Sequence, residues 1–240
     1  MIGSDIMMVL DECTEYPAGR DRVEKAVRRT VDWAAASYDY WRRGFDAGTQ
    51  GLFAIIQGGV HPELRMQCAD ALTGMDFSGF AIGGLSVGET REEYRDVTEY
   101  TAGLLPHGKP RYMMGVGSPM EILHAVGCGI DMFDCVMPTR IARNGTLFTS
   151  RGRVNIKSSA YARDDGPLDP DCGCHVCRSY TKSYLRHIFR AGEISSLIYN
   201  TYHNLYFMKG LMDEIRSSIY NDKFPDIYKK WNNYYGSTGN

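Results

Sequence analysis

The sequence has no long apolar run, no excess of one charge and no repeated or low-complexity segment. No apolar stretch approaches the roughly 20 residues that a membrane-spanning helix needs, so no membrane association is expected. The first residues, MIGSDIMMVLDECTEYP, have neither a basic start nor a small-residue cleavage site, and predict no signal peptide. A formal net charge of −2 over 240 residues excludes a strongly basic or acidic protein. With 43% hydrophobic and 23% charged residues, the composition is that of a globular protein.

A disulfide framework and a nucleotide fingerprint are also missing. Seven cysteines without a signal peptide predict free thiols in a reducing, cytoplasmic compartment. Four are dispersed and are most simply small buried hydrophobic residues, namely Cys13, Cys68, Cys128 and Cys135. No third glycine follows the glycines of GVG (115–117) at the required spacing, so no nucleotide cofactor is predicted.

Short apolar strands alternate with helices over the first 136 residues. The strands are predicted at Asp5–Leu10, Gly51–Gln57, Gly79–Leu85, Arg111–Gly117 and around 129–136. The helices are predicted at Asp21–Phe45, His61–Thr73, Glu89–Leu104 and near Pro119–Val126. Strands that alternate with helices in this way form βαβ units and a parallel sheet that is covered on its faces.

Each predicted strand ends in polar or glycine-rich residues. In α/β folds the carboxyl ends of parallel strands form the ligand-binding edge, and five strands that contribute to one rim favour a barrel. A (β/α)8 barrel needs eight strands, and only five fit before the pattern stops. The sequence therefore predicts an incomplete (β/α)8 (TIM) barrel.

The period changes after Asp134. Alternation around Asn144-Gly145 predicts a β-hairpin, since this dipeptide is a strong hairpin signal. A loop-like segment with clustered cysteines follows, then helices predicted at Ser179–Arg190, Glu193–Ser218 and near Asp222–Tyr235, and a disordered tail, GSTGN. We expect three parts: a partial barrel over 1–157, a zinc-binding subdomain over 158–206, and C-terminal helices over 207–240 that pack on the barrel.

Three cysteines crowd into a C-x-C-x2-C pattern, formed by Cys172, Cys174 and Cys177. Three thiolates and one histidine suit a tetrahedral structural zinc site. His175 lies between two of the ligands and would strain the loop, and we favour His203 over His187 as the fourth ligand. Three cysteines close together by chance are the alternative, which is weaker because such a cluster without a metal invites oxidation.

The segment GIDMFDCVMPTRIARNG (129–145) carries two aspartates inside an otherwise apolar run, where burial of an unpartnered carboxylate would be costly. Strand alternation puts Asp134 and Asp131 on opposite faces, with Asp134 nearer the carboxyl end. Asp134 therefore lies at the ligand-binding edge, where a carboxylate can act as a nucleophile, as a general acid/base or as a ligand for the edge of a base. Asp131 lies at the start of the strand and is predicted to be structural. A helix cap or an ion pair with Arg140 is the alternative for Asp134.

Other strand ends add recognition groups. Asp11 follows the first strand, Gln57 ends the second, and Gly83-Gly84 follows the third. Together they would bind a flat heterocycle that carries both hydrogen-bond donors and acceptors. From Arg140 to Arg190, ten Lys or Arg residues against four Asp residues give a local net charge of +6, which suits a polyanion or a solvated surface.

These motifs resemble a known family. DECT, IIQGG, GGLSVGE, MGVG, DMFDCVMPTR, NGTLFT and C-x-C-x2-C with a later histidine occur in the order found in bacterial tRNA-guanine transglycosylases. The resemblance covers nearly the whole chain and implies a (β/α)8 barrel with a zinc subdomain. It also implies a pentosyltransferase that exchanges guanine at the tRNA wobble position for 7-aminomethyl-7-deazaguanine, a precursor of queuosine.

The resemblance also implies residue roles. Asp134 matches the nucleophile that forms a covalent aspartyl–RNA intermediate, and Asp11 matches the carboxylate on the guanidine-like edge of the base. The remaining matches to base contacts are Gln57, the backbone of Gly84, the Leu85 carbonyl, and Tyr112 and Met114 as residues that sandwich the base. Arg140 and Arg143 resemble contacts to the anticodon loop, and the zinc ligands match Cys172, Cys174, Cys177 and His203. Cys13 and Val87 resemble residues of the bacterial enzymes, which accept the small precursor base, and not those of the eukaryotic enzymes, which take queuine.

The family also implies tRNAs for Asp, Asn, His and Tyr as partners, a homodimer and no nucleotide cofactor. Two departures stand out. The chain starts where a full-length member reaches its fourth strand, without the second aspartate proposed as general acid/base, and Ile141 replaces a polar residue. An inactive fragment, a chain that needs a complementing chain, and a non-catalytic tRNA-binding or zinc scaffold are therefore the alternatives.

Overall fold

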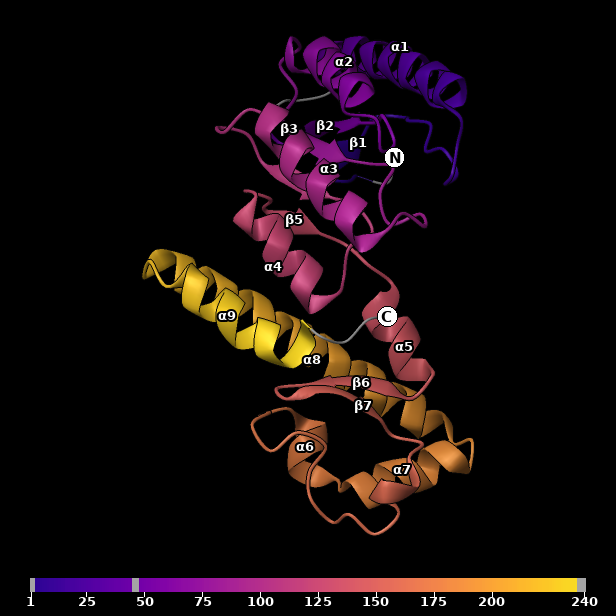
Figure 1. Ribbon diagram of the computed structural model, residues 1–240, viewed down its shortest axis with the longest axis vertical. Helices are drawn as coiled ribbons and strands as arrows, with labels where there is room; N and C mark the ends of the chain where they lie inside the picture. The colour runs from indigo at the N-terminus through magenta and orange to yellow at the C-terminus, as the bar shows by residue number, and fades with distance from the viewer. Residues whose placement is uncertain (1–2, 45–47, 237–240) are drawn as a thin grey trace. The chain divides into compact units, whose positions relative to one another are not determined.

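The computed structural model describes residues 3–44 and 48–236, and its internal contacts divide into two compact units (Figure 1). The first unit comprises Met1–Val116 and His124–Asp134, and the second comprises Gly117–Leu123 and Cys135–Asn240. The predicted disordered tail, apart from Gly236, lies outside the described residues, as does Phe45 of the first predicted helix. The predicted domain boundaries at residues 157 and 206 stay a prediction.

The first unit contains a parallel five-stranded sheet in the order β1-β2-β3-β4-β5. The strands are β1 (Ile6–Met8), β2 (Gly51–Ile56), β3 (Gly79–Ile82), β4 (Arg111–Met113) and β5 (Met132–Phe133). Each sequential strand pairs with the next, as in a β/α barrel, so the sheet is a five-stranded half-barrel and the predicted incomplete barrel is confirmed. All five strands are shorter than predicted. Left-handed glycines follow two of them, Gly84 and Gly115, and turn the chain out of the sheet.

Helices join these strands and cover them. They are α1 (Arg20–Gly44), α2 (Pro62–Thr73), α3 (Arg91–Leu104) and α4 (Pro119–Gly127). Helix α1 packs on α2 and β2, α2 packs on α3 and β2, and α3 packs on β3. Because crossovers between parallel strands are right-handed, strands in sequential order place their connecting helices on one face of the sheet. The central strands β2 and β3 are nonetheless buried on both faces, so the carboxyl edge of the sheet is where side chains can meet a ligand.

Local sequence explains where α3 begins. The Thr90 side chain accepts from the Glu93 amide, and the Glu93 carboxylate accepts from the Thr90 amide at 2.8 Å. This reciprocal capping box satisfies amides that the first helical turn leaves without partners. The helix therefore begins at Arg91, two residues after the predicted start.

The second unit is built from helices and one hairpin. It contains α5 (Met137–Arg143), β6 (Thr146–Thr149), β7 (Gly152–Asn155), a 3-10 turn η1 (Ser159–Tyr161), α6 (His175–Ser179), α7 (Lys182–Arg190), α8 (Ile194–Tyr220) and α9 (Phe224–Tyr235). The long helix α8 packs against α5, α6, α7, α9 and β6. The short helix α6 lies in a segment that the sequence predicts as loop. In the part of the chain that the structure describes, no helix is both long and apolar enough to cross a bilayer.

The predicted hairpin exists, but the prediction of its turn is wrong. Antiparallel β6 and β7 pair Thr149 with Gly152, so the turn lies at residues 150–151 and not at Asn144-Gly145. Asn144 instead is the C-cap of α5, and Gly145 follows it with φ +85°. A left-handed glycine after an asparagine ends a helix as readily as it makes a hairpin turn, because both need the same backbone conformation.

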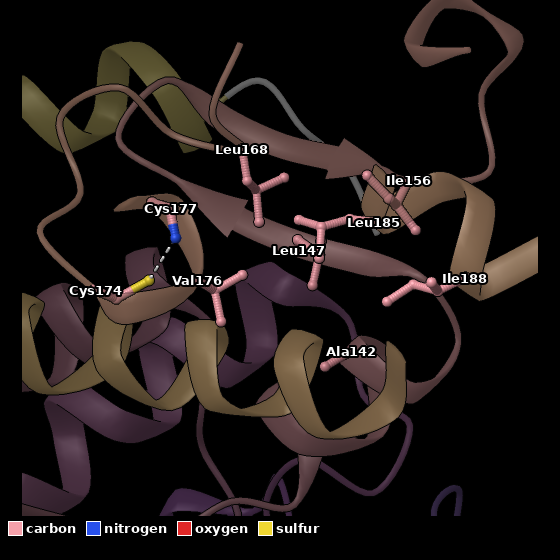
Figure 2. Close-up of a cluster of buried hydrophobic side chains, with 9 residues drawn as sticks. All are labelled: Ala142, Leu147, Ile156, Leu168, Cys174, Val176, Cys177, Leu185 and Ile188. Atoms are coloured by element: carbon pink, nitrogen blue, oxygen red, sulfur yellow. Dashed lines mark hydrogen bonds between the residues drawn. The ribbon is translucent and has the colours of Figure 1, made fainter. Parts of the chain in front are cut away.

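A buried apolar cluster forms the centre of the second unit (Figure 2). Its side chains come from α5, the hairpin, the segment between the hairpin and α7, and α7 itself. They are Ala142, Leu147, Ile156, Leu168, Cys174, Val176, Cys177, Leu185 and Ile188. Asn204 of α8 adds a buried polar link, since its Oδ1 accepts from the Phe148 amide and its Nδ2 donates to the Pro138 carbonyl. These contacts fix the hairpin on α8.

Candidate functional site

The polar residues predicted at the first two strand ends meet in the first unit. Asp11 follows β1, Gln57 follows β2 directly, and Gln57 is 2% exposed. The Gln57 Nε2 donates to Asp11 Oδ2 at 2.6 Å. A carboxylate and an amide that face each other at a sheet edge offer both acceptor and donor atoms to a planar ligand.

Glycines 83 and 84 allow Gln57 to lie against the backbone after β3. A Cβ at Gly83 would come within 2.6 Å of Gln57 Nε2, and a Cβ at Gly84 would overlap Gln57 Oε1. Gly84 also has φ +67°, which L-residues with side chains rarely adopt. The GG motif is therefore required by close approach and by backbone conformation together. Leu85 follows and is buried.

Glu89 organises the loop that continues from Leu85. Its carboxylate accepts from the amides of Ser86 and Val87, and from that of Gly88 at 3.1 Å. Three amides directed at one carboxylate hold the loop in a fixed turn, with Ser86 at φ 61°. The conformation of the SVGE part of this motif (86–89) is thus fixed by contacts within the motif itself.

A buried arginine that the sequence analysis missed supports this edge from beneath. Arg65 of α2 has no exposed surface, and its guanidinium donates to the Gly59 carbonyl at 2.7 Å and the Gly83 carbonyl at 3.0 Å. Burial lowers the pKa of Arg65 to about 10. A sequence signal exists, because Arg65 lies one helical turn from Cys68 and two turns from Leu72, on the buried face of α2.

Asp134 lies after β5 and is held by two donors. The Tyr112 hydroxyl donates to Asp134 Oδ1 at 2.6 Å, and the Gly115 amide donates to the same oxygen at 3.0 Å. Burial, followed by the hydrogen bond to Asp134, raises the pKa of Tyr112 above its usual value. Tyr112 therefore stays protonated and remains a donor. This contact between Tyr112 and Asp134 was not predicted from the sequence.

The two aspartates of the apolar run differ as expected, although neither is buried. Asp131 Oδ2 accepts from the Arg111 amide at 2.8 Å, so it closes the edge between β4 and β5 and is structural. The helix-cap alternative for Asp134 is wrong, because the N-cap of α5 is Val136. Both side chains are exposed, so neither carboxylate carries the cost of burial that its apolar neighbours in the sequence suggested.

The second unit gathers the predicted metal ligands. The ligand atoms of Cys172, Cys174, Cys177 and His203 all lie within 4.8 Å of one another. The His203 Nδ1 faces the three sulfur atoms, at 3.9 Å from Cys172, 3.5 Å from Cys174 and 3.4 Å from Cys177. Its Nε2 contacts the Phe148 carbonyl at 2.7 Å, which fixes the ring orientation. The choice of His203 over His187 and His175 is confirmed.

Local geometry brings the cysteines together. Cys174 is the N-cap of α6, and its Sγ accepts from the Cys177 amide at 3.4 Å (Figure 2). Cys172 and Cys177 lower the pKa of the Cys174 thiol through hydrogen bonds. Three thiols that converge with one imidazole nitrogen form the Cys3His donor set of structural zinc sites. The residues present therefore fit zinc, and the four donors leave no position open for catalysis.

Comparison with known proteins identifies the family. The model of the family described as queuine tRNA-ribosyltransferase matches residues 1–237. The chain belongs to this family. Queuine tRNA-ribosyltransferases of Caldanaerobacter subterraneus and Shouchella clausii are 47% and 48% identical over 98% of the chain, and that of Leptospira biflexa is 47% identical over the same share. The chain spans 62%, 62% and 63% of the lengths of these relatives.

Membership of the queuine tRNA-ribosyltransferase family supports the metal assignment in the second unit. The family contains tRNA-guanine transglycosylase enzymes, and the Cys3His group of this chain is consistent with a structural zinc. The roles predicted for single residues stay predictions. Met114 is half-buried after β4, and Arg140 and Arg143 are exposed on α5 of the second unit.

Proposed function

We propose that this chain carries the base-exchange chemistry of a tRNA-guanine transglycosylase. In this reaction guanine at the anticodon wobble position leaves tRNA and 7-aminomethyl-7-deazaguanine takes its place. The observation that carries the proposal is the pair of donors on one oxygen of Asp134, from Tyr112 and Gly115. It occurs at the carboxyl edge of the sheet that also carries the Asp11–Gln57 pair.

Asp134 is the proposed nucleophile. With Oδ1 bound by two donors, Oδ2 is the oxygen that attacks the anomeric carbon of the ribose. The bond from that carbon to the base breaks, its electron pair stays with the base, and the base takes up a proton from solvent water. The incoming base then loses a proton to solvent water and displaces Asp134 from the same carbon. Two displacements retain the configuration, as in retaining glycosidases that use a carboxylate nucleophile.

The base edge recognises a purine-like heterocycle. The carboxylate of Asp11 accepts from the guanidine-like edge, and the amide of Gln57 and the N–H of Gly84 serve the carbonyl oxygen. The carbonyl of Leu85 serves the aminomethyl group. Gln57 already bonds Asp11 at 2.6 Å, so the base enters a site whose polar groups are oriented beforehand. Met114 and the ring of Tyr112 complete the proposed base contacts.

The remaining parts of the proposal concern RNA and location. Arg140 and Arg143 are proposed to contact phosphates of the anticodon loop, whose unpaired base leaves its stack at low cost. The zinc bound by the Cys3His group would keep the second unit folded and takes no part in the reaction. The family resemblance supports tRNAs for Asp, Asn, His and Tyr and a homodimer. Seven free cysteines support a cytoplasmic location.

The test is incorporation of radiolabelled guanine into tRNA. We expect incorporation by the wild-type chain, loss of at least about a thousandfold in Asp134→Asn, and near-normal incorporation in Asp131→Asn. Asp131 is the matched control, because it is also exposed and accepts a hydrogen bond from the Arg111 backbone amide. The side-chain oxygen of an asparagine can still accept that hydrogen bond. Tight tRNA binding without incorporation by the wild type would instead favour a non-catalytic scaffold or a chain that needs a complementing chain.

A further inference from the structure

Arg65 is a fully buried cation that the proposed chemistry does not yet use. Its Nε donates to the Gly59 carbonyl, Nη1 lies 3.4 Å from the Ile56 carbonyl, and Nη2 contacts the carbonyls of Gly83 at 3.0 Å and Gly84 at 3.5 Å. These acceptors belong to the ends of β2 and β3. One side chain from α2 therefore joins the two loops that form the base edge.

The chain is shaped to admit this side chain. A Cβ at Gly58 would lie 2.6 Å from both the Cγ and the backbone nitrogen of Arg65, so only glycine allows α2 to approach β2 this closely. Gly59 follows with φ +56° and directs its carbonyl to the guanidinium. The IIQGG motif thus serves Arg65 as well as Gln57.

Arg65 carries its charge among neutral acceptors. Among the described residues, the recorded ion pairs do not include Arg65, and its hydrogen bonds go to backbone carbonyls. A pKa of about 10 leaves the guanidinium charged at neutral pH. Burial of a charge without a directly bonded carboxylate is costly, even though the Glu89 carboxylate attracts the guanidinium from a longer distance. The charge therefore calls for a functional explanation.

The peptide between Gly83 and Gly84 links Arg65 to the base. Its carbonyl accepts from Arg65. Its N–H faces the Cys13 thiol in this structure and is the Gly84 donor that the proposed function assigns to the carbonyl oxygen of the base. A hydrogen bond to the carbonyl polarises the peptide and strengthens its N–H as a donor, an effect that a low local dielectric increases. The charge of Arg65 thus acts on the base through a single peptide unit.

We propose that Arg65 is a positioning residue for base exchange. It holds the Gly83–Gly84 peptide with the N–H directed to the carbonyl oxygen of the base, and its charge stabilises the electron density on that oxygen. That density rises when Asp134 bonds to the anomeric carbon and the base departs with the electron pair of the broken bond. This inference rests on the proposed function, because the base is the ligand.

The test compares Arg65→Met and Arg65→Lys with Leu72→Ala, a fully buried residue of the same helix. Thermal unfolding measures the stability of each variant, so that variants of equal stability can be compared. Calorimetry gives guanine affinity, labelled-guanine exchange gives kcat and KM, and NMR relaxation gives the order of the Gly84 amide. We expect Arg65→Met to lose at least tenfold in guanine affinity and in kcat, with the Gly84 order parameter falling from about 0.85 toward 0.6. Arg65→Lys should recover part of both, and Leu72→Ala should change neither.

The outcomes separate the two claims. If wild-type protein neither binds guanine nor exchanges it, the proposed function fails, and the order of the Gly84 amide in the variants still decides whether Arg65 positions it. Unchanged Gly84 order, or unchanged guanine affinity in a folded Arg65→Met, overturns the positioning role. If Arg65→Met does not fold, the comparison of Arg65→Lys with Leu72→Ala decides. Equal losses of guanine affinity and kcat in these two variants, at equal stability, overturn the positioning role.

Discussion

The two polar clusters of this chain are held in place by different forces. In the second unit, four donor atoms converge within 4.8 Å, and their chemistry suits one zinc ion that replaces many weak contacts. In the first unit, Asp11, Gln57 and Asp134 are oriented by hydrogen bonds to neighbouring side chains and to backbone amides. A metal cluster concentrates its stability in one ligand set, whereas a sheet edge spreads it over strands, turns and a buried arginine.

This difference predicts how each cluster responds when one of its groups is removed. Removal of one zinc ligand removes the whole centre, because a bound metal contributes to folding as a unit. Removal of one group from the sheet edge removes a single hydrogen bond and leaves the strands paired. The first unit should therefore lose function stepwise, and the second should lose structure all at once.

The largest effect is expected from Cys174→Ser or from chelation of the metal. Structural zinc contributes roughly 10 kcal/mol to the folding of small zinc domains, so α6 to α8 should lose their order while the sheet of the first unit stays folded. Metal analysis with hydrogen exchange in each unit measures this. Cys128→Ser, a half-buried cysteine of the first unit, is the control and should retain zinc. Equal loss of order in both units would contradict the expectation that only the second unit depends on the metal.

A smaller effect is expected from Gly84→Ala. A left-handed φ costs a residue with a Cβ about 1–2 kcal/mol, and the new methyl group would displace Gln57. Guanine affinity should fall at least tenfold while zinc content stays normal. Gly103→Ala is the control, because Gly103 lies in α3 with open space around it and ordinary helical φ. Normal guanine affinity in Gly84→Ala would show that the edge tolerates a side chain there.

The smallest effect on folding is expected from Tyr112→Phe, which removes one of the two donors to Asp134. A hydrogen bond to a charged group contributes about 1.5–3 kcal/mol, so kcat should fall roughly 10- to 100-fold, while the melting temperature changes little. The guanine exchange assay with thermal unfolding measures both. Tyr220→Phe, at 88% exposure, serves as the control. A change in KM alone would assign Tyr112 to base stacking, the role that the family resemblance implies.

Local patterns were the most predictable part of the molecule. Strand–helix alternation gave the five strands of the half-barrel, and C-x-C-x2-C gave three metal ligands, because both depend on spacing over a few residues. Asn144-Gly145 was misinterpreted for the same reason: its backbone preference suits a helix end and a hairpin turn alike, and only the packing of α5 on α8 decides between them.

The contacts that the sequence could not predict join residues far apart in the chain. Tyr112 meets Asp134 because β4 pairs with β5, in a register that sets Tyr112 beside Met132. Arg65 reaches Gly83 because α2 packs behind β2, beside the end of β3. No local pattern encodes either distance, although an arginine on the apolar face of α2 was a visible signal.

By itself the sequence determined the kinds of chemistry present: carboxylates and amides at strand ends, thiols at metal-ligand spacing, and glycines where side chains would not fit. These follow from residue type and short-range periodicity. The tertiary structure alone decided which groups face each other at the sheet edge, such as Tyr112 on Asp134 and Arg65 beneath Gly83. The physical reason is that a hydrogen bond needs its donor and acceptor about 3 Å apart, a distance that only strand register and helix packing can set between residues far apart in the chain.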